Sequence, residues 1–286
     1  MAVAVVKPSA EQLARLAPFE RRAFHLVDFV NTNPLTKATA AAFLRTVGTT
    51  WVYFATRRLI HILGMDHVRQ LRPRRGLLLV SNHRSFFDQY VIACWLLRES
   101  DLLRRVYFPV RADFFYQRPL GLAVSLLMSA LSMYPPVFRE DSKREFNSYG
   151  LKRLIQILQQ PGSVVGIHPE GTRNKGPDPY TLLPAQPGVG KLILEARPEV
   201  LPIFINGLGN DLKKQVGGNF DGSGSPVVIA FGKPLDLTSF YARRNTLRAQ
   251  KDLADSVRQA ITSLGPVERE YRLELEARPR RGPVLL

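Results

Sequence analysis

The stretch Gly76-Leu77-Leu78-Leu79-Val80, followed after Ser81 by Asn82-His83-Arg84-Ser85-Phe86-Phe87-Asp88, decides the fold class. The short apolar run is typical of a buried strand. Ser85-Phe86-Phe87-Asp88 precedes a second apolar stretch, which predicts a capping box that opens a helix reaching about Leu97. The order strand, polar loop, helix is the unit from which α/β sheets are built.

His83 and Asp88 are the first candidate pair for chemistry. Residues five apart in a regular helix lie about 140° apart around its axis, so the two cannot pair within one helix. They can pair if His83 lies on the loop that leaves the strand and Asp88 lies in the first turn of the helix. Alone, a Ser-x-x-Asp segment also fits an ordinary helix start, so a second motif is needed.

That second motif is His168-Pro169-Glu170-Gly171-Thr172-Arg173, which follows the strand-like run Ser163-Val164-Val165-Gly166-Ile167. Pro-Glu-Gly favours a tight turn, and Gly171 can take a positive φ. We expect Glu170 and Arg173 at the rim of this turn. The alternative is an ordinary surface turn with a solvated ion pair.

The rest of the chain alternates strand-like and helix-like segments, which predicts an α/β fold with a mixed, mostly parallel sheet flanked by helices. A helix is expected before Pro161, with a late helix stopped by Gly265-Pro266. Further expected elements are a helix at Val189 to Ala196, strands at Val200 to Ile205 and Val227 to Phe231, and a loop at Gly217 to Ser225.

We expect three regions: residues 1–70 as N-terminal helices at a membrane interface, 71–266 as the catalytic domain, and 267–286 as a charged, mobile tail from Glu268. Phe43 to Phe54 has an apolar face at helical spacing and ends at Arg57-Arg58, which suits an interfacial helix. A helix packed on the core is the alternative. The start, Met1 to Lys7, is too short for a secretory signal.

Pro119 to Phe138 is an uncharged stretch whose length permits a membrane span. A single crossing there would separate His83 from Glu170, so we predict a buried or interfacial helix that ends near Pro135-Pro136. The net charge is +16. Such a charge fits nucleic acid, an anionic membrane surface or acidic substrates. The single Cys94 fits a reducing compartment.

The two motifs, in this order and about 85 residues apart, resemble those of the glycerolipid acyltransferases, specifically the 1-acyl-glycerol-3-phosphate (lysophosphatidate) acyltransferases. Val137-Phe138-Arg139 is similar to the family's second block and Val200-Leu201-Pro202-Ile203 to its fourth. Gln186-Pro187-Gly188-Val189 stands where the family has a glycine-bearing turn. The sequence departs from the family at His168, where phenylalanine is usual.

The resemblance implies transfer of a fatty acyl group from acyl-CoA or acyl-carrier protein to the free hydroxyl of a lysophospholipid, without a cofactor or metal. His83 would be the general base, oriented by Asp88. Arg139 and Arg173 would bind the acceptor phosphate. Glu170, Gly171 and Thr172 would contribute to acceptor binding. His168 receives no role, and His25, His61 and His67 lack comparable partners.

Three alternatives remain open: glycerol-3-phosphate as the acceptor, a lyso-aminolipid as the acceptor, or a non-catalytic basic protein that binds a membrane or nucleic acid. Because the sequence contains no nucleic-acid-binding motif, no nucleic acid is expected. The expected partners are a lysophospholipid, an acyl thioester and an anionic membrane surface. The expected location is the cytoplasmic side of a membrane, peripheral rather than spanning.

Overall fold

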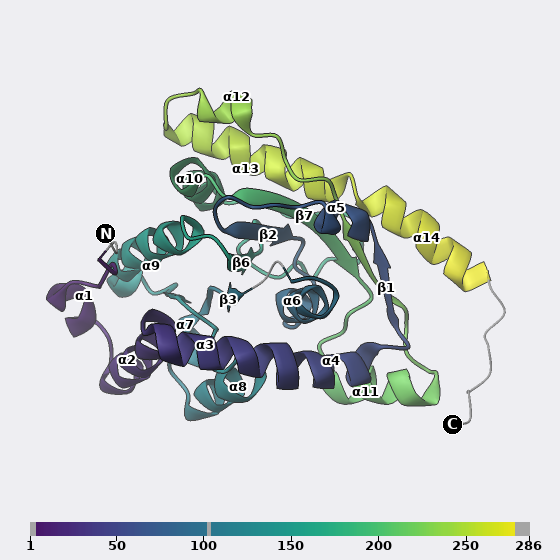
Figure 1. Cartoon of the computed structure of the whole chain (residues 1–286), viewed down its shortest axis with the longest axis horizontal. Helices are drawn as coiled ribbons and strands as arrows, with labels where there is room; N and C mark the ends of the chain where they lie inside the picture. Colours follow the sequence, from purple (N-terminus) through teal and green to yellow (C-terminus); the bar gives the residue numbers. More distant parts are fainter. Residues whose placement is uncertain (1–3, 102–103, 278–286) are drawn as a thin grey trace.

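A six-stranded sheet forms the centre of the computed structural model, which describes residues 4–101 and 104–277 (Figure 1). The strand order is β1-β8-β7-β2-β6-β3. Neighbouring strands pair in parallel, except that β7 and β8 are antiparallel. The predicted mixed, mostly parallel sheet is therefore confirmed. The strands are β1 (Ile60–Leu63), β2 (Leu77–Ser81), β3 (Arg105–Tyr107), β6 (Ser163–Ile167), β7 (Glu199–Asn206) and β8 (Val227–Phe231).

Helices cover both faces of this sheet. Helix α6 and the α3–α4 segment lie on one side, and α10 and α13 lie on the other (Figure 1). A short parallel pair, β4 (Val110–Arg111) and β5 (Pro136–Val137), lies apart from the main sheet. The helices are α1 (Ala10–Ala14), α2 (Pro18–Thr32), α3 (Pro34–Phe43), the π-helical η1 (Leu44–Gly48), α4 (Thr49–Thr56), α5 (Met65–Arg69), α6 (Asp88–Glu99), α7 (Ala112–Phe115), α8 (Pro119–Ser129), the 3-10 turn η2 (Asp141–Lys143), α9 (Arg144–Leu158), α10 (Pro187–Ala196), α11 (Leu212–Asp221), α12 (Thr238–Tyr241), α13 (Leu247–Thr262) and α14 (Gly265–Ala277).

Strand β2 lies in the middle of the sheet, and all five of its residues are buried. A strand covered on both faces has no polar side to alternate with, which explains the continuous apolar run that predicted it. Its parallel neighbours are β6 and β7, with Val80 opposite both Ile167 and Pro202. The carboxyl ends of these three strands therefore meet at one edge of the sheet.

The predicted elements around this centre are confirmed, with one exception. Helix α9 precedes Pro161, α10 contains the expected 189–196 helix, and β7 and β8 lie where strands were predicted. The predicted loop at Gly217 to Ser225 is wrong in its first half, which belongs to α11. Asp211 caps that helix by accepting from the N–H of Lys214, and Gly222, at φ +78°, ends it.

Helix α8 ends six residues before the predicted boundary near Pro135. Ala130 takes a left-handed conformation, and the N–H of Leu131 donates to the carbonyl of Ser125, which closes the helix with a Schellman-type turn. The chain then returns toward the core, where Met133 is buried. The outer side of α8 is apolar: Leu120, Leu126 and Leu127 are 53–70% exposed.

The predicted division of the chain needs two corrections. Residues 60–63 form β1, which pairs with β8, so a domain boundary at residue 70 would separate β1 from the rest of its sheet. Glu268 does not begin a mobile tail, because it lies in α14 and its buried carboxylate pairs with Arg272. The sequence did not reveal this helix, because the pair Gly265-Pro266, which was expected to stop a helix, instead forms the first turn of α14. Residues 278–286 of the predicted tail, and 1–3 of the N-terminal region, lie outside the described residues.

The N-terminal helices contribute to the core as well as to the surface. Phe24 of α2 packs edge-on against Phe146 and Tyr149 of α9. The expected helix from Phe43 to Phe54 is present as the end of α3, η1 and α4. It buries Val52 on one side, so the core-packed alternative holds for that side. In the described residues, no helix has both the length and the apolar character that crossing a membrane requires.

Candidate active site

Two loops meet at the carboxyl edge of the sheet. His83 lies two residues after β2, and His168 follows β6 directly. Because β2 and β6 are adjacent and parallel, the two motifs are brought side by side although about 85 residues separate them. This edge is where open α/β sheets place their ligands. The central requirement of the sequence-based prediction, a shared site, is met.

The histidine and the aspartate of the first motif pair as predicted. His83 Nδ1 lies 3.3 Å from Asp88 Oδ2. Asp88 is the first residue of α6, and the same oxygen accepts from the backbone N–H groups of Arg84 and Ser85. The predicted capping box therefore forms in part: Asp88 accepts from the N–H of Ser85, whereas Ser85 Oγ accepts from the N–H of Phe87 instead of that of Asp88 and donates to the carbonyl of Gly209.

Burial shifts the pKa of both groups. The pKa of Asp88 rises to about 6 because its carboxylate is buried, an effect that His168 and the backbone N–H groups of the loop partly offset. The pKa of His83 falls from 6.5 to about 4, first because of burial and second because of the charge of Arg173. At neutral pH the imidazole is therefore uncharged. A carboxylate can only accept, so Nδ1 carries the hydrogen and Nε2 keeps its lone pair.

Glu170 is buried, and the prediction that it lies at the rim of the turn is wrong. Its Oε1 accepts from the N–H of His83 and its Oε2 from the N–H of Leu183, both at 2.8 Å. The N–H of Asn174 donates to the carbonyl of His83, which adds a second link between the two loops. Glu170 thus holds residues 82–87, the candidate catalytic loop, in place, and its direct contact with an acceptor stays a prediction.

The turn of the second motif forms as the sequence predicts. Gly171 has φ +67°, and its N–H donates to the carbonyl of His168. A side chain at this position would be strained and would also approach Gln186 to 3.0 Å. Thr172 follows on the exposed side of the same loop. Both residues are therefore available at the mouth of the site.

Three guanidinium groups surround this mouth. Arg139 donates to the carbonyl of Gly171, Arg173 to Oδ1 of Asn210, and Arg84 to the carbonyl of Gly176. In residues 4–101 and 104–277 none of the three forms a salt bridge. Their charge is oriented by neutral groups and is not neutralised, which suits an anionic ligand.

A family model described as Acyltransferase matches residues 60–206. The chain belongs to the acyltransferase family. The matched part begins at β1 and ends with β7, so it contains both loops of the site. The family membership that the motifs predicted is confirmed.

Two curated relatives of this acyltransferase are chloroplastic glycerol-3-phosphate acyltransferases from Arabidopsis thaliana and Spinacia oleracea. They are 27% and 28% identical to it over 118 residues, which is 39% of this chain. The aligned part is 26% and 25% of these relatives, so the chain spans about a quarter of their length. The crystal structure of the 1-acyl-sn-glycerophosphate (LPA) acyltransferase PlsC from Thermotoga maritima is similar over 90% of both chains, with a TM-score of 0.50 and 17% identity. That likeness confirms the fold.

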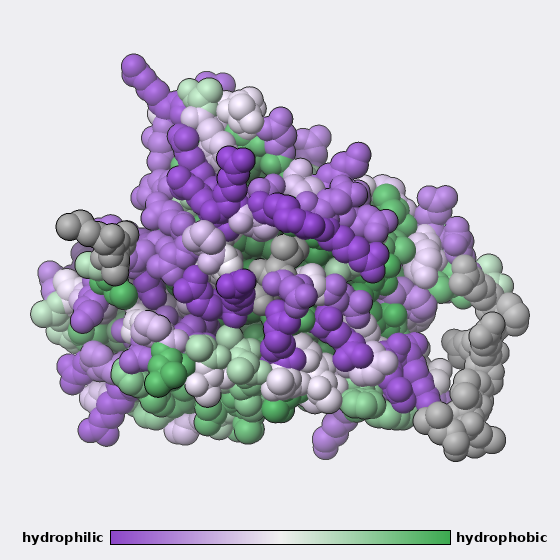
Figure 2. Space-filling view, viewed as in Figure 1, coloured by the Kyte–Doolittle hydropathy of each residue, from purple (hydrophilic) through white to green (hydrophobic). Residues whose placement is uncertain are grey.

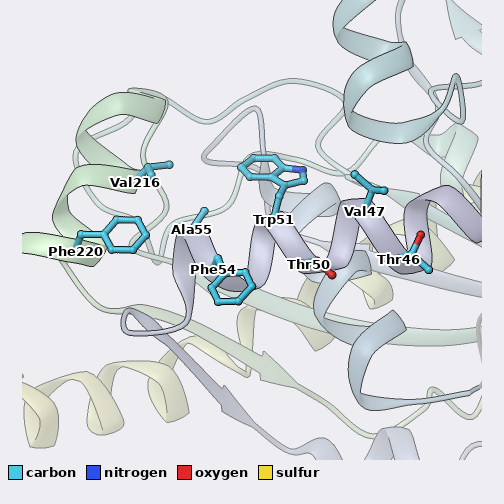
Figure 3. Close-up of a pocket in the computed structure, with 8 residues that line it drawn as sticks. All are labelled: Thr46, Val47, Thr50, Trp51, Phe54, Ala55, Val216 and Phe220. Atoms are coloured by element: carbon cyan, nitrogen blue, oxygen red, sulfur yellow. The ribbon is translucent and has the colours of Figure 1, made fainter. Parts of the chain in front are cut away.

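An apolar groove lies beside the acyltransferase site. It has a volume of about 700 Å³ and runs between α4 and α11 (Figure 3). Trp51, Phe54 and Phe220 contribute its aromatic walls. A narrower apolar cavity shares Trp51 with the groove and extends to Phe87, the residue before Asp88. Apolar side chains thus line both the groove and this small cavity, which reaches the loop that carries His83.

His83, Asp88 and His168 also offer atoms that can bind a metal, all within 4.8 Å of one another. The two imidazole rings, however, are stacked at 3.7 Å with an angle of 7° between their planes. An imidazole binds a metal along a lone pair in its ring plane, and an ion between stacked rings would lie outside both planes. This arrangement does not match a metal centre.

Sequence reasoning missed three polar residues of the site. Asn82 holds the loop against β7, because its side chain exchanges two hydrogen bonds with the backbone of Ile205. Asn210 accepts from Arg173 and from the N–H of Phe86. His168 contacts His83. The run Gly207-Leu208-Gly209-Asn210 after a strand was the available signal for Asn210, since functional loops follow strands at this edge.

Proposed function

We propose that this protein transfers a fatty acyl group from a thioester, acyl-CoA or acyl-carrier protein, to the free hydroxyl of 1-acyl-glycerol-3-phosphate, which gives phosphatidic acid. One observation carries the proposal: a neutral imidazole, oriented by Asp88, lies at the same edge of the sheet as Arg139 and Arg173. A base for a hydroxyl and a binding site for a phosphate are the two groups that this reaction needs.

In the proposed mechanism, His83 Nε2 removes the proton of the acceptor hydroxyl while the oxygen attacks the carbonyl carbon of the thioester. The C–O bond forms, the C–S bond breaks, and the thiolate that leaves takes the proton from the imidazolium. Asp88 stabilises the imidazolium through Nδ1. The acceptor hydroxyl replaces an enzyme nucleophile, so no acyl-enzyme is formed. A positioned base of this kind contributes about 10²–10⁴-fold in rate.

Arg173 is the principal candidate for the acceptor phosphate, with Arg139 beside it. A guanidinium can bind phosphate through two parallel hydrogen bonds. The charge of Arg173 also acts on His83, which supports a phosphate site close to the base. Phosphate bound there would offset this charge and raise the pKa of His83, so acceptor binding would strengthen the base.

The apolar groove between α4 and α11 is the candidate for the fatty chain of the donor. Every form of the proposed reaction requires an acylated donor, whereas one possible acceptor, glycerol-3-phosphate, has no chain. A small inner cavity, of about 20 Å³, shares Trp51 and Val216 with the groove and reaches Phe87, next to Asp88. A chain that lies along the groove would present its carbonyl end to the catalytic loop.

We further propose that the protein works at the cytoplasmic surface of a membrane without spanning it. Apolar side chains gather along the lower edge of the molecule, over α2, α4 and α8 (Figure 2). Gly121 allows α8 to approach Phe114 of α7 closely, and Phe114 packs on Phe86 of the catalytic loop. The apolar edge therefore adjoins the site, and the +16 net charge favours anionic lipids.

Glycerol-3-phosphate is the second candidate acceptor, because the curated relatives are named as glycerol-3-phosphate acyltransferases. It carries the same phosphate and would use the same arginines.

The test is thiol release by the purified protein, with palmitoyl-CoA and palmitoyl-acyl-carrier protein as donors. Lysophosphatidate, glycerol-3-phosphate and a lyso-aminolipid are compared as acceptors. We expect release that depends on lysophosphatidate and appears with phosphatidic acid. Preference for glycerol-3-phosphate would replace the acceptor and keep the mechanism. If no donor and acceptor pair reacts, the protein is a basic binding protein instead.

A further inference from the structure

The imidazole of His168 lies face to face with the imidazole of His83, and neither the family resemblance nor the proposed mechanism gives it a role. The ring centroids are 3.7 Å apart, and the planes differ by 7°. Among the aromatic contacts of the described residues, this is the shortest. The base is therefore supported on one face by a second ring.

Hydrogen bonds to the end of β2 hold His168 itself in place. Its Nδ1 lies 2.9 Å from the carbonyl oxygen of Asn82 and 3.2 Å from that of Ser81. Carbonyl oxygens only accept, so Nδ1 must carry the hydrogen and Nε2 stays unprotonated. Burial lowers the pKa of His168 to about 3, with His83 as the second cause. The supporting ring is thus neutral and fixed in one tautomer.

The ring of His83 needs this support. Its Nδ1 has one side-chain partner, Asp88, at 3.3 Å, which is longer than the usual range for a charge-assisted hydrogen bond. The torsion that sets the ring plane of a histidine is broad, so one long hydrogen bond leaves the plane loosely defined. A flat neighbour at van der Waals distance limits that rotation and keeps Nε2 directed at the acceptor.

We propose that His168 is a positioning residue: its neutral imidazole, anchored to the carbonyl groups that end β2, fixes the ring plane of the base His83. This inference rests on the proposed function, in which His83 is the base. The stacked face of the ring supplies the positioning. The Nδ1 hydrogen bonds hold the supporting ring and leave it uncharged.

Two substitutions separate the ring from its hydrogen bonds. His168→Phe keeps a flat ring against His83 and removes the donor, and phenylalanine is the residue usual in the family. His168→Asn keeps an N–H donor for the carbonyl groups of β2 and removes the ring. We expect His168→Phe to retain kcat within about 3-fold and His168→Asn to lose about 10–100-fold, because small misplacements of a reacting group cost rates of this size.

The Michaelis constants for donor and acceptor should change little in either variant, because neither substitution removes a binding group. Thermal unfolding of both variants is measured as the control for folding. Equal kcat for His168→Asn and the parent protein would overturn the inference. So would an active Asn variant beside an inactive Phe variant, since the hydrogen bonds would then be what matters.

A readout without turnover tests the geometry. In a proton NMR spectrum of the ¹³C-histidine-labelled protein, the His83 ring signals should be shifted by the facing ring, remain shifted in His168→Phe and move toward ordinary positions in His168→Asn. Unshifted His83 signals in the parent protein would refute the stacked arrangement. If the parent protein shows no transfer at all, the proposed function fails while this spectrum still decides the positioning. If the parent turns over and the Asn variant matches it, only the positioning role fails.

Discussion

Oε1 of Glu170 accepts a hydrogen bond from the backbone N–H of His83 at 2.8 Å, which joins two residues 87 positions apart in the chain. The other carboxylate oxygen accepts from Leu183, so the buried side chain holds both the catalytic loop and the segment after the second motif. A carboxylate with two oxygens can serve two donors at once. Glu170 thus connects the two motifs through the hydrogen bonds of one buried side chain.

Glu170→Gln tests this connection. A glutamine can accept at only one of the two positions, and its NH₂ group would face a second N–H donor. We expect the free energy of unfolding, measured in urea, to fall by about 1–3 kcal/mol, the usual cost of a buried group left unsatisfied. Transfer should fall chiefly through kcat, because His83 loses its place. The exposed Glu11→Gln is the matched control and should change neither quantity.

His83→Ala tests the base. Transfer should fall by about 10²–10⁴-fold. The melting temperature is measured beside it as the control for folding, because the side chain is only 19% exposed and contacts Asp88 and His168. His25 is exposed on α2, and His25→Ala should retain full activity. Turnover retained in His83→Ala would contradict the assignment, whatever the stability of the variant.

The pH dependence of transfer should reflect the charge of Arg173. Burial and this guanidinium lower the pKa of His83 to about 4, so the base stays unprotonated well below the 6.5 of a free imidazole. Removing the charge in Arg173→Gln raises the pKa of His83, so the part of the acidic limb of kcat/KM that belongs to this imidazole, below the step of Asp88 near pH 6, should move to higher pH. The imidazole of His83 then takes up a proton at a higher pH, so activity falls earlier on acidification.

Arg139→Gln is the control for that shift, because Arg139 is not among the causes that lower the pKa of His83. The KM for the acceptor should rise in both variants, while the limb should move in Arg173→Gln alone. A limb that stays in place in Arg173→Gln would show that the guanidinium does not act on the base.

The sequence predicted the parts of the site that follow from local chemistry. Thirteen consecutive residues around His83 predict the buried strand, the loop and the start of the helix. Gly171 predicts the tight turn of the second motif. The partners of Glu170 and Asn82 could not be predicted, because both side chains bind backbone groups of distant segments. Nearly every residue type has such backbone groups, so the sequence gives no signal for them. Helix α14 was missed for the opposite reason: tertiary contacts of Glu268 with Tyr180 and Asn206 outweigh a local Gly-Pro signal.

The groove between α4 and α11 should determine which acyl chains are accepted. Val216 lies on α11 and lines both the groove and the inner cavity, so Val216→Trp would fill the part of the groove next to this cavity (Figure 3). We compare octanoyl, lauroyl and palmitoyl donors. kcat/KM for palmitoyl should fall by about 10-fold or more, since each buried CH₂ contributes about 0.8 kcal/mol, and octanoyl should be spared. An equal loss for all three donors would place the chain elsewhere.

The apolar outer side of α8 should hold the protein on a membrane. Leu126 and Leu127 are 53% and 70% exposed, and burial of a leucine contributes about 1.5–3 kcal/mol. The double variant Leu126→Ser, Leu127→Ser should therefore sediment with anionic vesicles at least about 10-fold less well. Leu247 is equally exposed but lies on α13, on the opposite side of the sheet, so Leu247→Ser is the control (Figure 1). Added salt should weaken vesicle binding of the double variant more than vesicle binding of the parent protein. The double variant depends mainly on charge, and salt screens charge. If the Leu247 variant loses binding and the α8 variant does not, the membrane contacts the other side of the molecule.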